Sequence, residues 1–174
     1  MPNHIAPHKN KAHSTTQQRC EMVKLALQGH EKLQIDEREI KRNATSYTID
    51  TLKEIRTQYP TTPLCFIMGM DSLIHFNSWH QWEDILNYCH LIICSRPQWE
   101  KKFNRTIETL LAHHQTHCIE DLHTQLSGHI YFQETNQYDI SSTRIRDDIQ
   151  HANDVSALLP RPVYDYIQRF NLYK

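Results

Sequence analysis

The stretch Leu64-Cys65-Phe66-Ile67-Met68-Gly69-Met70-Asp71-Ser72-Leu73 decides the fold of this chain. Its apolar run ends at a single glycine, closely followed by an acid and a serine. This order is typical of a buried strand that passes through a loop into a helix. Glycine lets a backbone approach a ligand, and Asp71 or Ser72 can cap the helix behind it. Because ligands of open α/β sheets bind at the carboxyl ends of strands, we expect a site around Gly69.

Upstream of this stretch, the sequence predicts two helices and one short strand. A capping box at Ser14-Thr15-Thr16-Gln17 predicts a helix to about Gln28, and residues 33–36 alternate as a strand does. The charged run 36–43 predicts an exposed connection. A second helix, capped by Ser46 or Thr48 and ended by Pro60, would turn inward the side chains of Ile49, Leu52, Ile55 and Tyr59.

Downstream, helices and strands continue to alternate. We expect a helix at 79–88, buried strands at 90–94 and 130–132, a helix that opens at Ser141, and a terminal helix to about Phe170. Strands that alternate with helices predict an α/β fold with a largely parallel sheet. The length of 174 residues fits a single domain over 1–174.

The composition limits the classes of partner. The formal net charge of −1 offers no electrostatic case for nucleic acid, and no apolar run is long enough for a membrane span. The chain also starts without the apolar core of a signal peptide, so we expect a cytoplasmic protein. Its five cysteines include no C-x-x-C pair, and we expect Cys65 and Cys94 to be reduced core thiols. Among thirteen histidines, the run His113-His114-x-x-His117 lacks nearby partners, so we predict no protein metal site.

Two places in the chain combine the residue types that bind nucleotides. Ser141-Ser142-Thr143 opens a helix, and Arg146 follows one turn later, so amides, hydroxyls and a guanidinium can hold a phosphate. An ordinary serine N-cap explains the same serine. At the loop after Gly69, Trp79 can stack on a flat ring. The stripe that Trp79 shares with Trp82 also fits a hydrophobic core, the interpretation we favour for Trp82.

The motifs together resemble a specific family. The series comprises Ser46-Tyr47-Thr48, Gly69-x-Asp71-Ser72-Leu73, Trp79-x-x-Trp82, His90-Leu91 to Arg96-Pro97, Ile140-Ser141-Ser142-Thr143-x-Ile145-Arg146, and Leu159-Pro160. This ordered series is similar to that of bacterial nicotinate-nucleotide adenylyltransferase, and it covers essentially the whole chain. The resemblance implies a Rossmann-like nucleotidyltransferase fold with a mainly parallel sheet. It also implies an enzyme that makes nicotinate adenine dinucleotide and pyrophosphate from ATP and nicotinate mononucleotide, with Mg²⁺ accompanying ATP.

The resemblance assigns a role to each matched residue. Tyr47, Thr48, Trp79 and His80 would bind nicotinate mononucleotide, with the Trp79 ring on the pyridine. Gly69 and Asp71 would contact the adenosine of ATP, while Ser141, Ser142, Thr143 and Arg146 would hold its phosphates. His8, Lys9 and Arg96 are further candidate phosphate contacts. No catalytic side chain is identified. The oligomeric state does not follow from the sequence.

One departure from the family pattern leaves alternatives open. The family begins with a strand and a loop of the type G-G-x-F-D-P-x-H-x-G-H, whereas this chain has glycine only at 29, 69 and 128. Its first residues match the family after that βα unit, so we expect about 30 residues, the scale of such a unit, to be missing. Three explanations stay open: a start that is assigned too late, which we favour, a non-catalytic nucleotide-binding remnant, and a short variant completed by a partner. Another nucleotidyltransferase, such as one that uses phosphopantetheine, would not explain Tyr47 and Trp79.

Overall fold

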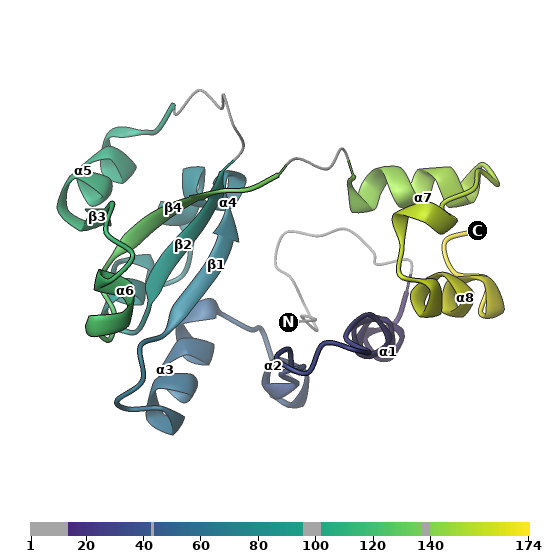
Figure 1. Ribbon diagram of the computed structural model, residues 1–174, viewed down its shortest axis with the longest axis horizontal. Coiled ribbons are helices and arrows are strands. Elements are labelled where there is room, and N and C mark those ends of the chain that lie inside the picture. Colours follow the sequence, from purple (N-terminus) through teal and green to yellow (C-terminus); the bar gives the residue numbers. More distant parts are fainter. Residues whose placement is uncertain (1–13, 43, 96–101, 137–139) are drawn as a thin grey trace. The chain divides into compact units, whose positions relative to one another are not determined.

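The computed structural model describes residues 14–42, 44–95, 102–136 and 140–174 (Figure 1). Contacts divide the chain into two compact units. One, the sheet unit, is Tyr47–Gln137, and the other, the helical unit, combines Met1–Ser46 with Tyr138–Lys174. The single domain over 1–174 stays a prediction.

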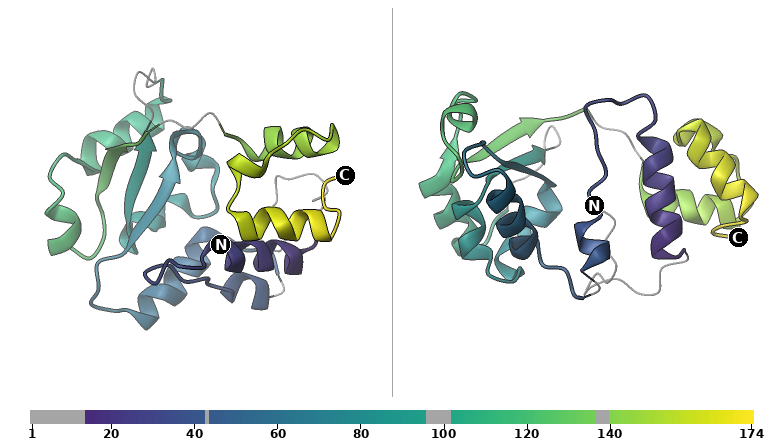
Figure 2. Two further views of the ribbon diagram at one scale, coloured as in Figure 1. Left: turned by 45° about the vertical axis from the view of Figure 1, so that its right-hand side comes forward. Right: turned by 90° about the horizontal axis from the view of Figure 1, so that it is seen from below.

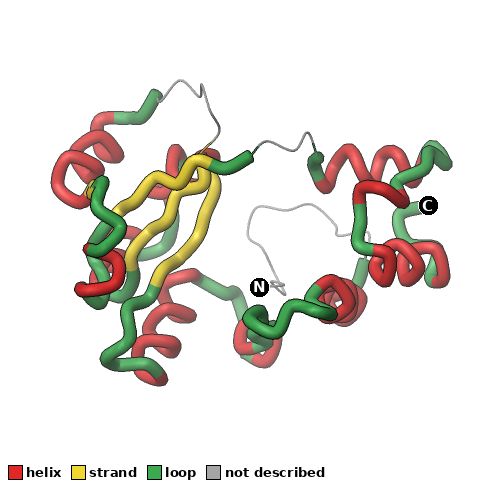
Figure 3. The backbone as a smooth tube through the Cα atoms, in the orientation of Figure 1, coloured by secondary structure: helices red, strands yellow, loops and turns green. Residues whose placement is uncertain are grey.

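The sheet unit is built on parallel strands, as the alternating pattern predicted. β1 (Cys65–Gly69), β2 (His90–Ser95), β4 (Ile130–Glu134) and β3 (Gln115–Thr116) lie in the order β1-β2-β4-β3, and every neighbouring pair is parallel. The strands are yellow in Figure 3. Gly69 pairs with Cys94, and Ser95 pairs with Glu134. The register therefore brings the carboxyl ends of β1, β2 and β4 to one edge of the sheet, where ligands of such sheets bind.

Helices of the sheet unit pack on its apolar side chains. They are α3 (Thr48–Gln58), α4 (Met70–Ile74), the 3₁₀ helices η1 (Phe76–Ser78) and η2 (Trp82–Asn87), α5 (Arg105–His114) and α6 (Asp121–Thr124). The core joins Met68, Leu91 and Ile93 of the strands to Ile49 and Leu52 of α3 and to Ile107 and Leu111 of α5. Burial of this apolar surface is the main favourable term that holds the unit together.

β1 is less buried than its apolar run predicted. Met68 is buried, but Cys65 is exposed and Ile67 is 65% exposed. The reason is that β1 forms one edge of the described sheet, and alternate side chains of a strand point to opposite faces. The prediction that Cys65 is a core thiol is therefore wrong, and Cys94 is only half-buried.

The helical unit packs its first helix against its last. α1 (Thr16–Ala26) lies beside α8 (Arg161–Arg169), as both views of Figure 2 show. The unit also contains α2 (Arg38–Lys41), α7 (Ser142–Gln150) and η3 (Ser156–Leu158). Its core consists of Ile149, Val155, Val163, Ile167 and Leu172, with Met22 and Leu25 packed against it. The helices expected from Ser141 and after Pro160 are confirmed.

The structure corrects three expectations before residue 47. The capping box belongs to Thr15 and Gln18 instead of Ser14 and Gln17, because the Ser14 hydroxyl is hydrogen-bonded to the Tyr173 hydroxyl at 3.1 Å. Residues 33–36 form no strand; Asp36 instead accepts a hydrogen bond from the Arg38 amide. The charged connection after it contains α2, whose Glu39 is buried.

Three further corrections concern helix ends. Tyr47, instead of Ser46 or Thr48, is the N-cap of α3, and Tyr59 is 47% exposed where the backbone leaves that helix. Gly69 is the N-cap of α4, with no side-chain cap from Asp71 or Ser72. The segment 79–88 forms 3₁₀ helix η2 instead of an α-helix that starts at Trp79.

Within the described residues, no helix has both the length and the apolarity needed to cross a membrane.

A buried imidazole ties the amino ends of β2 and β4 together. His90 is fully buried; its Nε2 lies 2.9 Å from the Gln125 carbonyl oxygen, and its Nδ1 accepts from the His129 amide at 3.1 Å. A nitrogen that accepts cannot also carry a proton, so this geometry requires the neutral ring. Burial, followed by the neighbouring His129 and Arg56, holds the pKa of His90 below 6.5, although Gln125 and Asp121 oppose the shift.

We expect the stability of the sheet unit to fall in mild acid because of His90. Below pH 6.5, the usual histidine pKa, His90 binds a proton in the unfolded chain but stays neutral in the folded protein because its pKa there is lower. The contribution of neutral His90 to the free energy of unfolding is therefore fully present above pH 6.5. It is lost as the pH falls toward the lowered pKa that His90 has in the folded protein. Urea unfolding, followed by tryptophan fluorescence from pH 7.5 to 5, should show this loss. His90→Gln should flatten the slope, and His30→Gln, an exposed control, should retain it; equal slopes in all three proteins would contradict the assignment.

Candidate functional site

Gly69 is the last residue of β1, and the space where a side chain would lie is open. A Cβ built on this residue meets no atom within 4 Å, and its φ of −83° is accessible to any residue. The glycine is therefore not required by backbone strain or by packing within the described structure. Asp71 follows in the first turn of α4 with an exposed side chain. Both residues lie where the carboxyl edge of the sheet is accessible to a ligand.

Aromatic rings gather around the turn before η2. The half-buried Trp79 ring packs edge-on against Phe66 of β1, with centroids 6.1 Å apart. It also packs against Phe76, tilted by 57° with centroids 5.5 Å apart. The exposed His80 ring lies 4.3 Å from the Tyr47 ring, tilted by 35°. The structure thus brings together the predicted mononucleotide residues Tyr47, Thr48, Trp79 and His80 at the start of α3 and the turn before η2. Trp82 packs against the core, as we favoured from the sequence.

The start of α7 has the features of an anion site. The Ser141 hydroxyl is the N-cap and accepts from the Arg144 amide at 3.1 Å, while Ser142 and Thr143 are exposed in the first turn. This first turn contains no acidic residue. Arg146 donates from Nε to the Ser142 carbonyl at 2.8 Å, which holds its guanidinium beside the same turn. The positive end of a nine-residue helix and one arginine are thereby combined.

The candidate residues are divided between the two units. Gly69 and Asp71 belong to the sheet unit, and Ser141, Ser142, Thr143 and Arg146 belong to the helical unit. His8, Lys9 and Arg96 lie outside the described residues. Within the residues that are described, no group of three or more histidine, cysteine, aspartate or glutamate side chains could hold a metal ion.

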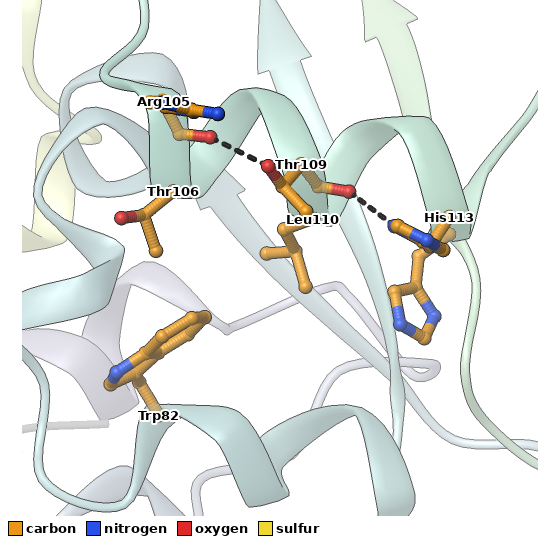
Figure 4. A pocket seen from close by; sticks show the side chains of 7 residues that line it. Trp82, Arg105, Thr106, Thr109, Leu110 and His113 are labelled. Carbon is orange, nitrogen blue, oxygen red and sulfur yellow. Dashed lines mark hydrogen bonds between the residues drawn. The ribbon is translucent and has the colours of Figure 1, made fainter.

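A cavity of about 530 Å³ lies elsewhere in the sheet unit, between α5 and η2 (Figure 4). It is lined by Trp82, Arg105, Thr106, Thr109, Leu110, His113 and His114. The Thr109 hydroxyl donates to the Arg105 carbonyl, and His113 Nδ1 bonds the Thr109 carbonyl, so much of this polar lining is engaged within α5. None of the predicted site residues lines this cavity.

The rings of Tyr47, Trp79 and His80 form what we call the ring cluster. The sequence analysis missed two residues that lie beside it. Lys53 Nζ donates to Gln81 Oε1 at 3.0 Å, and Gln81 has a left-handed backbone with φ 49°. The helical pattern predicts that Lys53 lies on the polar face of α3. Gln81 gives no local sign of a turn, because glutamine is not a typical turn residue. Only the approach of α3 to the turn before η2 identifies this pair.

Comparison with known proteins decides the family. A family model described as cytidylyltransferase-like matches residues 1–148. A probable nicotinate-nucleotide adenylyltransferase of Psychromonas ingrahamii is 53% identical over 174 residues, which are 100% of this chain and 81% of that protein. The chain belongs to the nicotinate-nucleotide adenylyltransferase family. A second relative with the same name, from Aeromonas salmonicida, is 43% identical with the same coverage.

Solved structures agree on the fold. Plasmodium falciparum nicotinic acid mononucleotide adenylyltransferase, complexed with NaAD, matches with a TM-score of 0.66 over 98% of this chain and 78% of that chain, at 19% identity. A putative nicotinate-nucleotide adenylyltransferase from Vibrio parahaemolyticus matches with a TM-score of 0.57 over 89% of this chain and 69% of that chain, at 17% identity. The predicted nucleotidyltransferase fold with a parallel sheet is therefore confirmed, and members of this family are transferases.

Proposed function

We propose that this protein transfers the adenylyl group of ATP to nicotinate mononucleotide, giving nicotinate adenine dinucleotide and pyrophosphate for NAD biosynthesis. The observation that carries the proposal is the 53% identity along all 174 residues to a relative named for this reaction. Because the relatives are named as enzymes over the whole matched length, catalysis is favoured over a non-catalytic remnant.

The ring cluster is suited to the mononucleotide. A pyridine ring would stack on Trp79, whose indole packs against Phe66 and Phe76. The backbone near His80 would contact the carboxylate of that pyridine ring. Tyr47 and Thr48 would complete this pocket from the start of α3. Rings that are already fixed lose little conformational freedom when a ligand binds, which favours affinity.

The remaining candidates are suited to ATP. Gly69 and Asp71 would meet the adenosine, while the first turn of α7 and Arg146 would hold the phosphates, with His8, Lys9 and Arg96 as further contacts. The mononucleotide phosphate would attack the α-phosphorus in line, the bond to the β-phosphate oxygen would break, and pyrophosphate would leave. Such a reaction depends on positioning and charge stabilisation, so it needs no covalent nucleophile from the protein.

Nucleotidyltransferases generally use a divalent metal ion, and we propose Mg²⁺ bound to ATP. Mg²⁺ keeps several waters and is usually held by substrate phosphates with one or two carboxylates. Among the described residues no three side chains form a ready-made metal site, so the ion would arrive with its nucleotide, held mainly by phosphates and water. When bound, the ion would neutralise charge on the phosphates.

The direct test uses protein purified from its own cells. It is incubated with Mg²⁺, ATP and nicotinate mononucleotide, and the dinucleotide and pyrophosphate are measured together. We expect equal amounts of both products, and none when either substrate is omitted. A parallel reaction with nicotinamide mononucleotide measures the ring preference. Nucleotide binding without either product would overturn the proposal in favour of the remnant.

Trp79→Ala should weaken nicotinate mononucleotide binding by about 1–3 kcal/mol, the usual loss for one aromatic stacking partner. Trp79→Phe keeps a ring and should recover part of this loss. Tyr59→Ala removes a 47% exposed ring elsewhere in the sheet unit and serves as the control. Titration calorimetry with the mononucleotide measures all three, and the melting temperature reports any loss of packing. Unchanged affinity in Trp79→Ala would exclude stacking and favour a different acceptor, such as phosphopantetheine.

A further inference from the structure

Three consecutive residues in the turn between η1 and η2 are each held by a different neighbour. Trp79 packs against Phe66 and Phe76, and the His80 ring lies against the Tyr47 ring. Gln81 is held by the hydrogen bond from Lys53 Nζ to its Oε1, at 3.0 Å. The turn is therefore fixed by the sheet, by the start of α3 and by the second turn of α3.

The backbone of Gln81 is the strained part of this turn. Its φ of 49° and ψ of 40° lie in the left-handed region, which residues with a Cβ rarely adopt. Such a conformation persists where surrounding contacts hold it, and it is frequent at ligand sites. Trp79 is extended, with ψ 149°, while the Gln81 carbonyl accepts the Asp84 amide of η2 at 3.1 Å. Gln81 thus reverses the chain directly after the two proposed ring-binding residues.

One helix supplies both contacts that hold residues 80 and 81. Tyr47 is the N-cap of α3, and Lys53 lies in the same helix. The ammonium of Lys53 also lies over the Tyr88 ring, 5.9 Å from its centroid, which limits where its flexible stem can place the charge. Because a helix is rigid, two contacts from it fix both the place and the direction of the turn.

We propose that Lys53 and Gln81 are positioning residues for the mononucleotide side of the site, because their hydrogen bond holds Trp79 and His80 in the geometry that receives the pyridine ring. This inference rests on the proposed function. Neither side chain contacts the substrate; each acts through the turn. The hydrogen bond therefore sets affinity for the mononucleotide and leaves the affinity for ATP unchanged.

The test combines backbone exchange with kinetics. Lys53→Met keeps most of the stem and removes the donor. We expect faster hydrogen exchange at the Trp82 and Asp84 amides, which close the turn. The KM for nicotinate mononucleotide should rise roughly 10-fold, since a small misplacement of a binding group is costly. The KM for ATP and the melting temperature should not change.

Matched variants separate positioning from charge and from folding. Lys53→Arg retains a donor and should restore most of the mononucleotide KM. Gln81→Gly relieves the left-handed strain, so it should fold well and still raise that KM. Lys32→Met removes one exposed positive charge from the other unit and should change nothing.

Two results would overturn the inference. Exchange at Trp82 and Asp84 that is unchanged in Lys53→Met would show that the bond does not hold the turn. A mononucleotide KM that stays unchanged, or rises only together with the ATP KM and a lower melting temperature, would exclude positioning. If the unaltered protein makes no dinucleotide, the proposed function fails instead, and the exchange measurement still decides whether Lys53 holds the turn.

Discussion

Ile93→Ala is expected to lower the free energy of unfolding of the sheet unit by about 2–5 kcal/mol. Ile93 lies in the centre of β2, is fully buried, and packs in the cluster that joins the strands to α3 and α5. Its truncation removes apolar surface from the core and leaves a cavity that close-packed neighbours fill only in part. Urea unfolding followed by tryptophan fluorescence measures the loss, because Trp79 and Trp82 belong to the same core.

Ile67→Ala is the matched control for that loss. It removes the same atoms from the neighbouring strand, where the side chain is 65% exposed. We expect a change below about 1 kcal/mol, the range of β-propensity effects. A loss at Ile67 as large as that at Ile93 would show that this face of β1 is covered in the protein in solution, contrary to the exposure of Ile67 in the structure.

Arg146→Ala is expected to weaken the use of ATP by about 1–3 kcal/mol, the scale of a charge-assisted hydrogen bond to phosphate. This is roughly 5- to 150-fold in kcat/KM for ATP at fixed mononucleotide. The bond from Nε to the Ser142 carbonyl holds the guanidinium beside the first turn of α7, and no described residue forms an ion pair with it. Its charge is therefore available to a ligand.

Two variants control for the Arg146 effect. Arg146→Lys keeps the charge but loses the planar fork, so it should recover only part of the activity. Arg161→Ala removes an exposed arginine that pairs with Asp165 in the same unit and should leave the ATP dependence unchanged. Normal ATP dependence in a folded, active Arg146→Ala protein would exclude the phosphate role.

The strands and the main helices could be predicted because their residues carry local signals. Apolar runs ended by Gly69 and by Ser95 predicted parallel strands, and Ser141 predicted the start of α7. The prediction of a short strand at 33–36 was wrong, because alternation alone cannot supply a neighbouring strand for its backbone hydrogen bonds. Register and helix caps also depend on competing partners, as the bond between Ser14 and Tyr173 shows.

The site was predicted residue by residue, but its geometry was not. The resemblance selected Tyr47, Trp79 and His80, and the roles assigned to them stay proposals. The contact of the His80 and Tyr47 rings and the bond of Lys53 to Gln81 join residues about 30 positions apart in the chain. No local pattern encodes such contacts, since they arise only when α3 and the turn before η2 pack on the same sheet.

By itself, the sequence determined the α/β class, the parallel order of strand and helix, and the membership of a nucleotidyltransferase family, because periodicity and ordered motifs are local properties of the chain. Only the tertiary structure decided that Ile67 is exposed, that His90 must be neutral, and that Gln81 is held in a left-handed conformation. Each of these depends on which surfaces meet and which are left to solvent, and that is settled by packing between distant segments.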